Sequence, residues 1–300
     1  MSAEQEQTFT SHGVAFDRSP SKFGWLRESQ EIAHDKDALQ ERMKEDGYLF
    51  MRDILDKQVV LDARREILEK LDSVEEIDRN HPLMEAVFSG RSNRASASAQ
   101  NFAQQLRLGE KIRALVHSGK VIEFYETFFG DEVRPFDFIW LRAVRVGGAT
   151  GCHYDWVYMG RGTRKLYTSW IPIGDVPYSD GALCILENSH KDEELVNTYG
   201  ASDVDDRSKP NPWGGWFTTN PLQVQERVGG RWLTADGGGF RTGDMLVFSM
   251  WTMHCSMDNR SPVNRIRLSS DTRYQLASEP ADHRWVGNNP IAHGAAAKRG

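Results

Sequence analysis

The spacing of apolar residues changes along the chain and separates a helical part from a strand-rich part. Residues 37–46 have the composition of a helix, and two further short helices are expected over 111–117 and 121–129. Within 56–71 the apolar residues recur at helical spacing, at Val59, Val60, Ala63, Ile67 and Leu71. We therefore predict a helical buttress over residues 35–130 that packs against a sheet.

Short strands are predicted from about residue 131 onwards. The segments are rich in β-branched and aromatic residues and are separated by glycine-containing turns. The predicted strands cover 133–146, 165–173, 182–187, 243–254 and 265–274. Because short strands with such turns are typical of jelly rolls, we predict a mainly β fold with flanking helices (α+β). Its core would be a double-stranded β-helix, the cupin-like jelly roll, over residues 131–275.

Polar stretches without an apolar period define the rest of the organisation. Residues 1–20 predict a loose N-terminal arm and residues 286–300 a mobile tail, which leaves 21–285 as a single domain. Within it, 191–240 is an insertion placed to cover a site. The segment 78–100, in which 89–100 is small and polar, fits either a flap near that site or a disordered, solvated loop.

The first candidate chemistry is a pair of metal-binding side chains at the end of a predicted strand. His153 and Asp155 are two residues apart, so strand alternation turns both to the same face. A third ligand, His254, ends the apolar segment 243–254. Two histidines and one carboxylate form the facial triad of non-haem Fe(II) oxygenases, although a His-x-Asp pair alone also arises by chance.

The strand that follows His254 carries the second candidate feature. Its alternation places Arg265, Arg267, Ser269 and Asp271 on one face. A guanidinium pairs in a planar fork with a carboxylate, so an arginine entering the barrel beyond a metal ligand indicates an acidic co-substrate. The competing interpretation is a surface arginine paired with a nearby aspartate.

With these residues in place, the chain resembles the phytanoyl-CoA dioxygenase family of Fe(II)/2-oxoglutarate-dependent oxygenases. The resemblance runs from about residue 46 to 285. The matching segments, in order, are 47–50, 153–155, 170–176, 181–190, 242–248, His254 and 267–269.

The resemblance implies that His153, Asp155 and His254 hold Fe(II) and that 2-oxoglutarate and O2 are co-substrates. The family's arginine often lies eleven residues after the distal histidine, which selects Arg265, whereas the Arg-x-Ser pattern selects Arg267 with Ser269. Both arginines stay candidates for binding 2-oxoglutarate, and we prefer Arg267.

The activity implied by the resemblance is oxidation of a C–H bond in a small organic molecule, by default hydroxylation, with decarboxylation of 2-oxoglutarate to succinate. Trp213 and Trp216, in the insertion, fit either substrate contacts or ordinary packing of the insertion on the sheet. A zinc-dependent jelly-roll hydrolase and a non-catalytic binding protein are the alternatives.

Net charge and apolar stretches limit the classes of binding partner, and the cysteine content indicates the cellular compartment. The net charge of −6 provides no basic face for a phosphate backbone, and no apolar stretch is long enough to span a membrane, so we expect neither nucleic acid nor membrane as a partner. The three cysteines, Cys152, Cys184 and Cys255, show no CxxC spacing and are odd in number. They are interpreted as small buried hydrophobes in a cytoplasmic protein.

Overall fold

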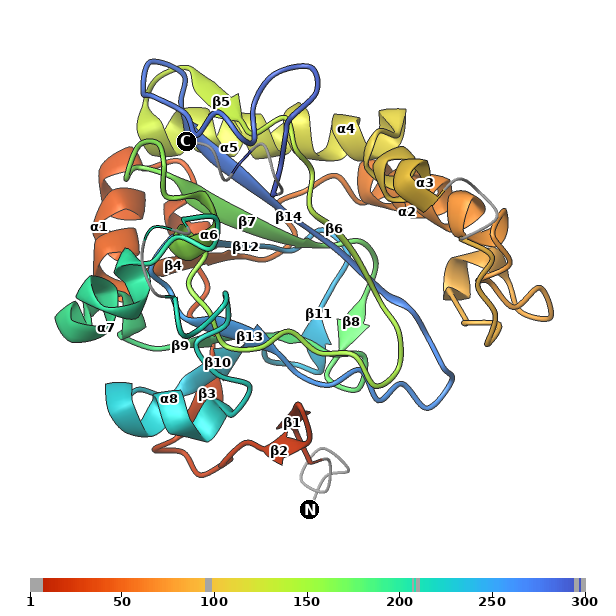
Figure 1. The fold of residues 1–300 in the computed structure, drawn as a ribbon, viewed down its shortest axis with the longest axis horizontal. Coiled ribbons are helices and arrows are strands. Elements are labelled where there is room, and N and C mark those ends of the chain that lie inside the picture. Colours follow the sequence, from red (N-terminus) through yellow and green to blue (C-terminus); the bar gives the residue numbers. More distant parts are fainter. Residues whose placement is uncertain (1–7, 95–98, 207, 209–210, 294–296, 298–300) are drawn as a thin grey trace.

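Two facing β-sheets form the centre of the protein, and helices cover the outer face of the larger sheet (Figure 1). The computed structural model describes residues 8–94, 99–206, 208, 211–293 and 297. This arrangement confirms the predicted class, a mainly β fold with flanking helices. The division into arm, domain and tail stays a prediction.

The larger sheet is antiparallel and carries most of the interior side chains described below. Its strand order is β4-β12-β7-β14-β5, and β6 also pairs with β14. The strands are β4 (Tyr48–Met51), β5 (Val133–Pro135), β6 (Leu141–Val144), β7 (Tyr167–Pro172), β12 (Met245–Ser249) and β14 (Arg267–Leu276). The long strand β14 pairs with β5, β6 and β7, so it fixes the position of its neighbours.

The smaller sheet closes the other side of the barrel. Its order is β13-β9-β10-β3, and only the β10–β3 pairing is parallel within it. The strands are β3 (Phe23–Trp25), β9 (Leu183–Leu186), β10 (Trp232–Thr234) and β13 (His254–Ser256). Two short ribbons accompany it: β1 (Thr10–Ser11) with β2 (Val14–Ala15), and β8 (Val176–Pro177) with β11 (Gly239–Phe240).

Helices were predicted over 37–46, 56–71, 111–117 and 121–129, and the structure has a helix at each of these places, whereas the helix over 99–107 and those in and beside the insertion were not predicted. The helices are α1 (Lys36–Asp46), α2 (Lys57–Asp72), α3 (Ala99–Arg107), α4 (Glu110–His117) and α5 (Lys120–Phe129), with shorter α6 (Trp156–Met159), α7 (Glu193–Asn197) and α8 (Pro221–Val228) in and beside the insertion. The side chains of Asp35 and Asp56 accept hydrogen bonds from the first turns of α1 and α2, which satisfies amides that the helices leave free.

Strand β14 separates two hydrophobic clusters. Its residues Leu268 and Tyr274 face the helices, where Tyr274 stacks on Tyr125 of α5 with ring centroids 4.3 Å apart. The opposite face of β14 points between the two sheets, where Trp170 packs against Phe240 at 4.7 Å. One strand therefore anchors the helical layer and lines the barrel interior.

The chain between 243 and 254 differs from the single strand that we predicted. Strand β12 ends at Ser249, a turn in which the Thr252 amide donates to the Ser249 carbonyl follows, and β13 begins at His254 in the other sheet. An apolar run does not distinguish a buried strand from a buried turn, so the sheet change was hidden. Arg265 likewise precedes β14, which starts at Arg267.

Both ends of the described chain pack against the barrel. Phe9 and Phe16, within the predicted arm, are 3% and 5% exposed and join the cluster between the sheets, while residues 1–7 lie outside the described residues. At the other end Trp285 is fully buried, and the Ala292 amide donates to the Arg284 carbonyl. Of the predicted tail, 294–296 and 298–300 lie outside the described residues. None of the helices in the described part of the chain has the length and apolarity needed to cross a membrane.

The packing of Phe16 provides a test of the N-terminal segment. Replacing Phe16 by Ala should lower the free energy of unfolding by about 3–5 kcal/mol, because it empties a buried aromatic site. Chemical denaturation of the purified protein measures this loss. Val14→Ala, a change at a half-buried position of the same segment, is the control and should cost less than about 1.5 kcal/mol. A loss below about 0.5 kcal/mol for Phe16→Ala would mean that the segment is loose after all.

Candidate metal centre

The side chains of His153, Asp155 and His254 meet between the two sheets. One ligand atom from each residue lies within 4.8 Å of the other two, and all three side chains are buried. The Nε2 atoms of His153 and His254 are 3.7 and 3.9 Å from Asp155 Oδ1. Residues far apart in sequence thus converge on one point, as the facial-triad prediction required.

A pair of backbone hydrogen bonds brings the two histidines together. The His153 amide donates to the His254 carbonyl at 3.0 Å, and the His254 amide donates back to the His153 carbonyl at 3.1 Å. This antiparallel bridge places the imidazole centroids 4.1 Å apart. Asp155 follows at the start of α6, so the triad is built on a bridge and a helix end rather than on one regular strand.

Backbone carbonyls orient both imidazole rings. His153 Nδ1 lies 2.8 Å from the Gly151 carbonyl and His254 Nδ1 lies 3.0 Å from the Thr252 carbonyl. A carbonyl only accepts, so each Nδ1 carries the proton and each Nε2 keeps its lone pair. The lone pairs face Asp155, which is the arrangement that a metal ion requires.

The surroundings keep the triad in its metal-binding protonation state. Burial, together with the neighbouring His254, lowers the pKa of His153 to about 3. Burial also lowers the pKa of His254. Burial alone would raise the pKa of Asp155, but Arg273 and the two histidines outweigh it and lower that pKa below its ordinary value. At neutral pH the site therefore consists of two neutral imidazoles and one carboxylate.

Asp155 is itself held by two side chains of the larger sheet. Arg273 Nη2 donates to Asp155 Oδ1 at 2.7 Å, and the Thr168 hydroxyl donates to Oδ2. The guanidinium of Arg273 lies over the Trp140 ring at 4.3 Å. These contacts fix the carboxylate orientation, a role that we had not assigned to any residue from the sequence.

Arg267 lies further along the same interior face of β14. Its side chain is nearly fully buried, and its Nη1 donates to Ser269 Oγ at 2.6 Å. Its Nε has no hydrogen-bond partner among the described residues. Burial lowers the pKa of Arg267 to about 10, so it is still protonated at neutral pH. A buried cation that lacks a carboxylate is costly in isolation and fits an anion bound beside it.

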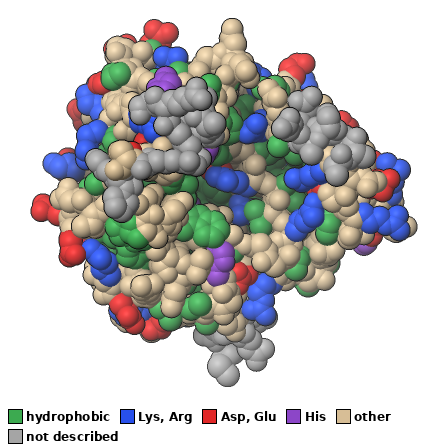
Figure 2. Space-filling model, in the orientation of Figure 1, with side chains coloured by type: hydrophobic (Ala, Val, Ile, Leu, Met, Phe, Trp, Pro, Cys, Tyr) green, Lys and Arg blue, Asp and Glu red, His purple; other side chains and the backbone are tan. Residues whose placement is uncertain are grey.

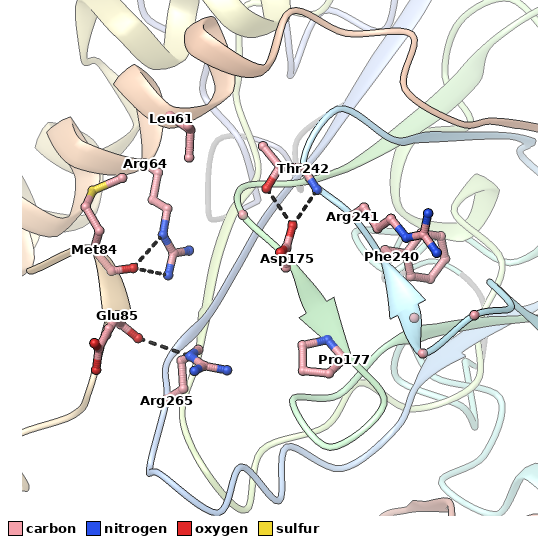
Figure 3. A pocket seen from close by; sticks show the side chains of 14 residues that line it. Leu61, Arg64, Met84, Glu85, Asp175, Pro177, Phe240, Arg241, Thr242 and Arg265 are labelled. Atoms are coloured by element: carbon pink, nitrogen blue, oxygen red, sulfur yellow. Dashed lines mark hydrogen bonds between the residues drawn. The ribbon is translucent and has the colours of Figure 1, made fainter. Parts of the chain in front are cut away.

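Arg265 occupies a different environment. Its Nη1 lies 2.9 Å from Asp180 Oδ2 and its Nε donates to the Glu85 carbonyl at 3.1 Å. It lines a cleft of about 630 Å³ that contains none of the triad residues and is also lined by Gly237, Gly238 and Gly239. Figure 3 shows Arg265 in this cleft with Arg64 and Asp175. Arg267 and Ser269 thus share a strand face with Arg273, which bonds Asp155, whereas Arg265 precedes the strand and pairs with Asp180.

The two insertion tryptophans lie differently. Trp213 packs on Tyr199 and Phe217, with ring centroids 5.5 and 6.4 Å away. Trp216 is 40% exposed and lies over Gly151, where an added Cβ would come within 2.7 Å of its ring. Trp216 is therefore close to the segment that carries His153, whereas Trp213 packs within the insertion.

Sequence reasoning did not identify Arg142, Arg273, Thr168 or Tyr158 as parts of this site. Tyr158 meets the His153 ring edge-on at 5.6 Å. The alternation of side chains along β14 could have predicted Arg273, because residue 273 lies on the same face as residues 267, 269 and 271. Thr168 lies on β7, which pairs with β12, and Arg142 lies on β6, which pairs with β14. No local sequence motif predicts these pairings.

Comparison with known proteins agrees with this geometry. A family model described as phytanoyl-CoA dioxygenase (PhyH) matches residues 43–267, three quarters of the chain. The chain belongs to the phytanoyl-CoA dioxygenase family. A relative from Streptomyces exfoliatus, 1-deoxypentalenic acid 11-beta-hydroxylase, is 24% identical over 258 residues, covering 82% of this chain and 83% of the relative.

Solved structures show the same fold. The epimerase SnoN in complex with Fe3+, alpha ketoglutarate and nogalamycin RO aligns with a TM-score of 0.54 at 20% identity, covering 87% of this chain and 96% of SnoN. EctD from S. alaskensis aligns with a TM-score of 0.52 at 15% identity, covering 96% of this chain and 94% of EctD. This phytanoyl-CoA dioxygenase family member is an iron- and 2-oxoglutarate-dependent oxygenase with the jelly-roll core predicted from its sequence.

The donor atoms fit this cofactor set. Two neutral imidazoles and a carboxylate suit Fe(II), and they leave other coordination positions to small molecules. The Nε of Arg267, which has no hydrogen-bond partner among the described residues, lies near the Ser269 hydroxyl and would suit the second carboxylate of 2-oxoglutarate. Iron and co-substrate therefore each meet suitable side chains in this family member.

The neutral histidines lead to a pH prediction. Ordinary histidines, with a pKa near 6.5, would be about 90% protonated at about pH 5.5. Competition between protons and the metal at two such histidines would raise the Kd about 100-fold relative to about pH 7.5. Because burial lowers both pKa values here, we expect the Kd for Mn(II) to rise less than about fivefold over that range. Anaerobic calorimetry measures the Kd, with circular dichroism at each pH as the folding control. A rise near 100-fold would contradict the prediction.

Proposed function

We propose that His153, Asp155 and His254 bind the iron and that Arg267 with Ser269 binds the distal carboxylate of 2-oxoglutarate in this oxygenase. The observation that carries the proposal is the buried Arg267, whose Nε has no partner in the described part of the chain and which shares an interior face with the residue that holds Asp155. An anion is needed there to compensate the buried charge.

With iron and 2-oxoglutarate bound, the site supplies O2 activation: one oxygen atom enters succinate as CO2 leaves, and the other is inserted into a substrate C–H bond to give an alcohol. The protein's own groups prepare this chemistry. Arg273 and Thr168 hold the Asp155 carboxylate, and the Gly151 and Thr252 carbonyls hold the imidazoles. Fixed ligand orientation is typically worth 10–100-fold in metal affinity or activity.

The substrate side is proposed from the residues that border the triad. Trp216, half-exposed above Gly151, and Tyr158, edge-on to His153, offer apolar contacts to a small organic molecule. Trp213 was the second candidate for a substrate contact. Its packing on Tyr199 and Phe217 favours a structural role within the insertion instead. The hydroxylase named among the relatives supports hydroxylation as the outcome.

A zinc hydrolase at the same triad would not require the buried Arg267. A non-catalytic binding protein would not require open coordination positions on a metal. Succinate production that depends on O2 and 2-oxoglutarate separates both alternatives from the oxygenase. We also place the protein in a reducing compartment such as the cytoplasm, since Cys152, Cys184 and Cys255 are all free and buried.

Loss of the carboxylate ligand is the first test. Asp155→Ala should reduce succinate formation to less than a tenth of the wild-type rate, because it removes both a ligand and the negative charge that stabilises the metal. Asp175→Ala, at an exposed carboxylate that bonds Thr242, is the matched control and should keep wild-type turnover. Retention of more than a tenth of the activity in Asp155→Ala would remove Asp155 from the ligand set.

The choice between the two arginines is tested by binding. Arg267→Gln should weaken 2-oxoglutarate binding by about 2–5 kcal/mol, because the distal carboxylate loses its buried charged partner. Arg265→Gln should change the Kd less than about threefold, since its guanidinium is engaged with Asp180. Both are measured by anaerobic titration of 2-oxoglutarate into the Fe(II)-loaded protein. The reverse pattern would assign the co-substrate to Arg265.

A further inference from the structure

A third interior arginine, Arg142 on β6, lies beside the co-substrate site. In the β6–β14 register Arg142 is directly opposite Ser269, the residue that bonds Arg267. Directly opposed residues project from the same face of a sheet, so Arg142 points between the two sheets. Its Nε and Nη2 donate to the two carboxylate oxygens of Asp271 at 3.0 and 2.8 Å.

Arg142 differs from the other two interior arginines in its access to solvent. Its side chain is 42% exposed, whereas that of Arg273 is 2% exposed and Arg267 as a whole residue is 3% exposed. Its Nη1 makes no hydrogen bond to the residues that the structure describes. Figure 2 shows a hollow near the centre of one face with Lys and Arg side chains inside it, in the part of the view where β6 lies in Figure 1. With its side chain 42% exposed and its Nη1 without a hydrogen bond to the described residues, Arg142 presents one free edge of its guanidinium to solvent.

The charged side chains linked around the triad do not balance. Ion pairs connect Arg142 to Asp271, Asp271 to Arg273, and Arg273 to Asp155. With Arg267 these are three arginines against two aspartates, which leaves one surplus positive charge. The two triad histidines are not counted, because each Nδ1 faces a backbone carbonyl and each Nε2 is left as a lone-pair donor for the metal.

Loading the enzyme does not remove this surplus. A ferrous ion brings two positive charges, and the two carboxylates of 2-oxoglutarate bring two negative charges. One positive charge therefore remains after both have bound. Two of the three arginines are buried and Arg142 is 42% exposed, so a ligand of opposite sign that reaches Arg142 compensates the surplus.

We propose that the prime substrate of this oxygenase carries a carboxylate and that the free edge of Arg142 binds it. This inference rests on the proposed function, because it takes iron and 2-oxoglutarate to occupy the triad and Arg267. One surplus charge matches a singly charged carboxylate, and the planar fork of an arginine matches its geometry. With the carboxylate held by Arg142 on β6, the remainder of the substrate extends toward Trp216 and Tyr158 and the triad. Arg142 is thus a specificity-determining residue.

The experiment compares matched acids and amides as probes. The acids are benzoate, cyclohexanecarboxylate and 1-adamantanecarboxylate, each beside its primary amide, which keeps the shape but removes the charge. Binding to protein loaded with Mn(II) and 2-oxoglutarate is measured by anaerobic calorimetry, and stimulation of 2-oxoglutarate decarboxylation is measured with Fe(II) in air. In the wild type at least one acid should bind about tenfold more tightly than its amide, the size expected when a charged pair replaces a neutral contact.

Two variants and a control locate the effect. Arg142→Gln should bring acid and amide within about twofold of each other, and Arg142→Lys should keep part of the preference because it keeps the charge but loses the fork. Arg145→Gln is the matched control: Arg145 lies just beyond the same strand, is 37% exposed and pairs with Glu76 at 2.8 Å, so the preference for acids should be unchanged. Melting temperatures confirm that each variant is folded.

The outcomes separate this inference from the proposed function. Absence of 2-oxoglutarate binding to the wild-type protein would overturn the proposed function and this inference with it. Normal binding and turnover of 2-oxoglutarate with no acid bound, or with amides bound as well as acids, would overturn only the assignment of a carboxylate substrate. If Arg142→Gln weakens 2-oxoglutarate binding more than tenfold and leaves the acid preference intact, Arg142 belongs to the co-substrate site and the inference is wrong.

Discussion

The reciprocal backbone hydrogen bonds between His153 and His254 are the interaction on which the site depends. They join the segment that follows β6 to the first residue of β13, and so they bring ligands from distant parts of the chain to within a few ångströms. Because the bridge consists of main-chain hydrogen bonds, it positions the two imidazole rings without using their ring nitrogens. Each Nδ1 then bonds a carbonyl of its own segment, which leaves both Nε2 atoms for a metal.

The barrel interior is also constrained by the charges it contains. Isolated ions between two sheets would be costly, and the protein arranges them as a chain from Arg142 through Asp271 and Arg273 to Asp155. Asp155 thereby stays ionised and correctly oriented although it is buried. Arg267 is the exception, since among the described residues its side chain hydrogen-bonds a hydroxyl and no carboxylate. The exception marks the place where 2-oxoglutarate is proposed to bind.

Strand β14 couples this chemistry to the stability of the fold. Its outward residues, such as Leu268 and Tyr274, belong to the cluster that holds the helices, and its inward residues Arg267 and Arg273 bond Ser269 and Asp155. The strand is paired with β5, β6 and β7 along its length. A shift of this strand by one residue would exchange its two faces, so packing on the helices also fixes the register of the interior charges.

Local patterns in the sequence were enough to predict four of the helices, most strands and the fold class, because apolar periodicity reflects a short stretch of backbone. The His-x-Asp spacing, which is also local, led to the candidate triad, whose role in metal binding is a proposal. Local patterns also led to both arginine candidates. Only the tertiary structure decided that the run before His254 changes sheets, that Arg265 engages Asp180 while Arg267 stays without a carboxylate, and that Arg142 and Arg273 approach the triad. These facts depend on which strands pair and in which register, and long-range pairing is specified by the packing of the whole barrel rather than by any segment of it.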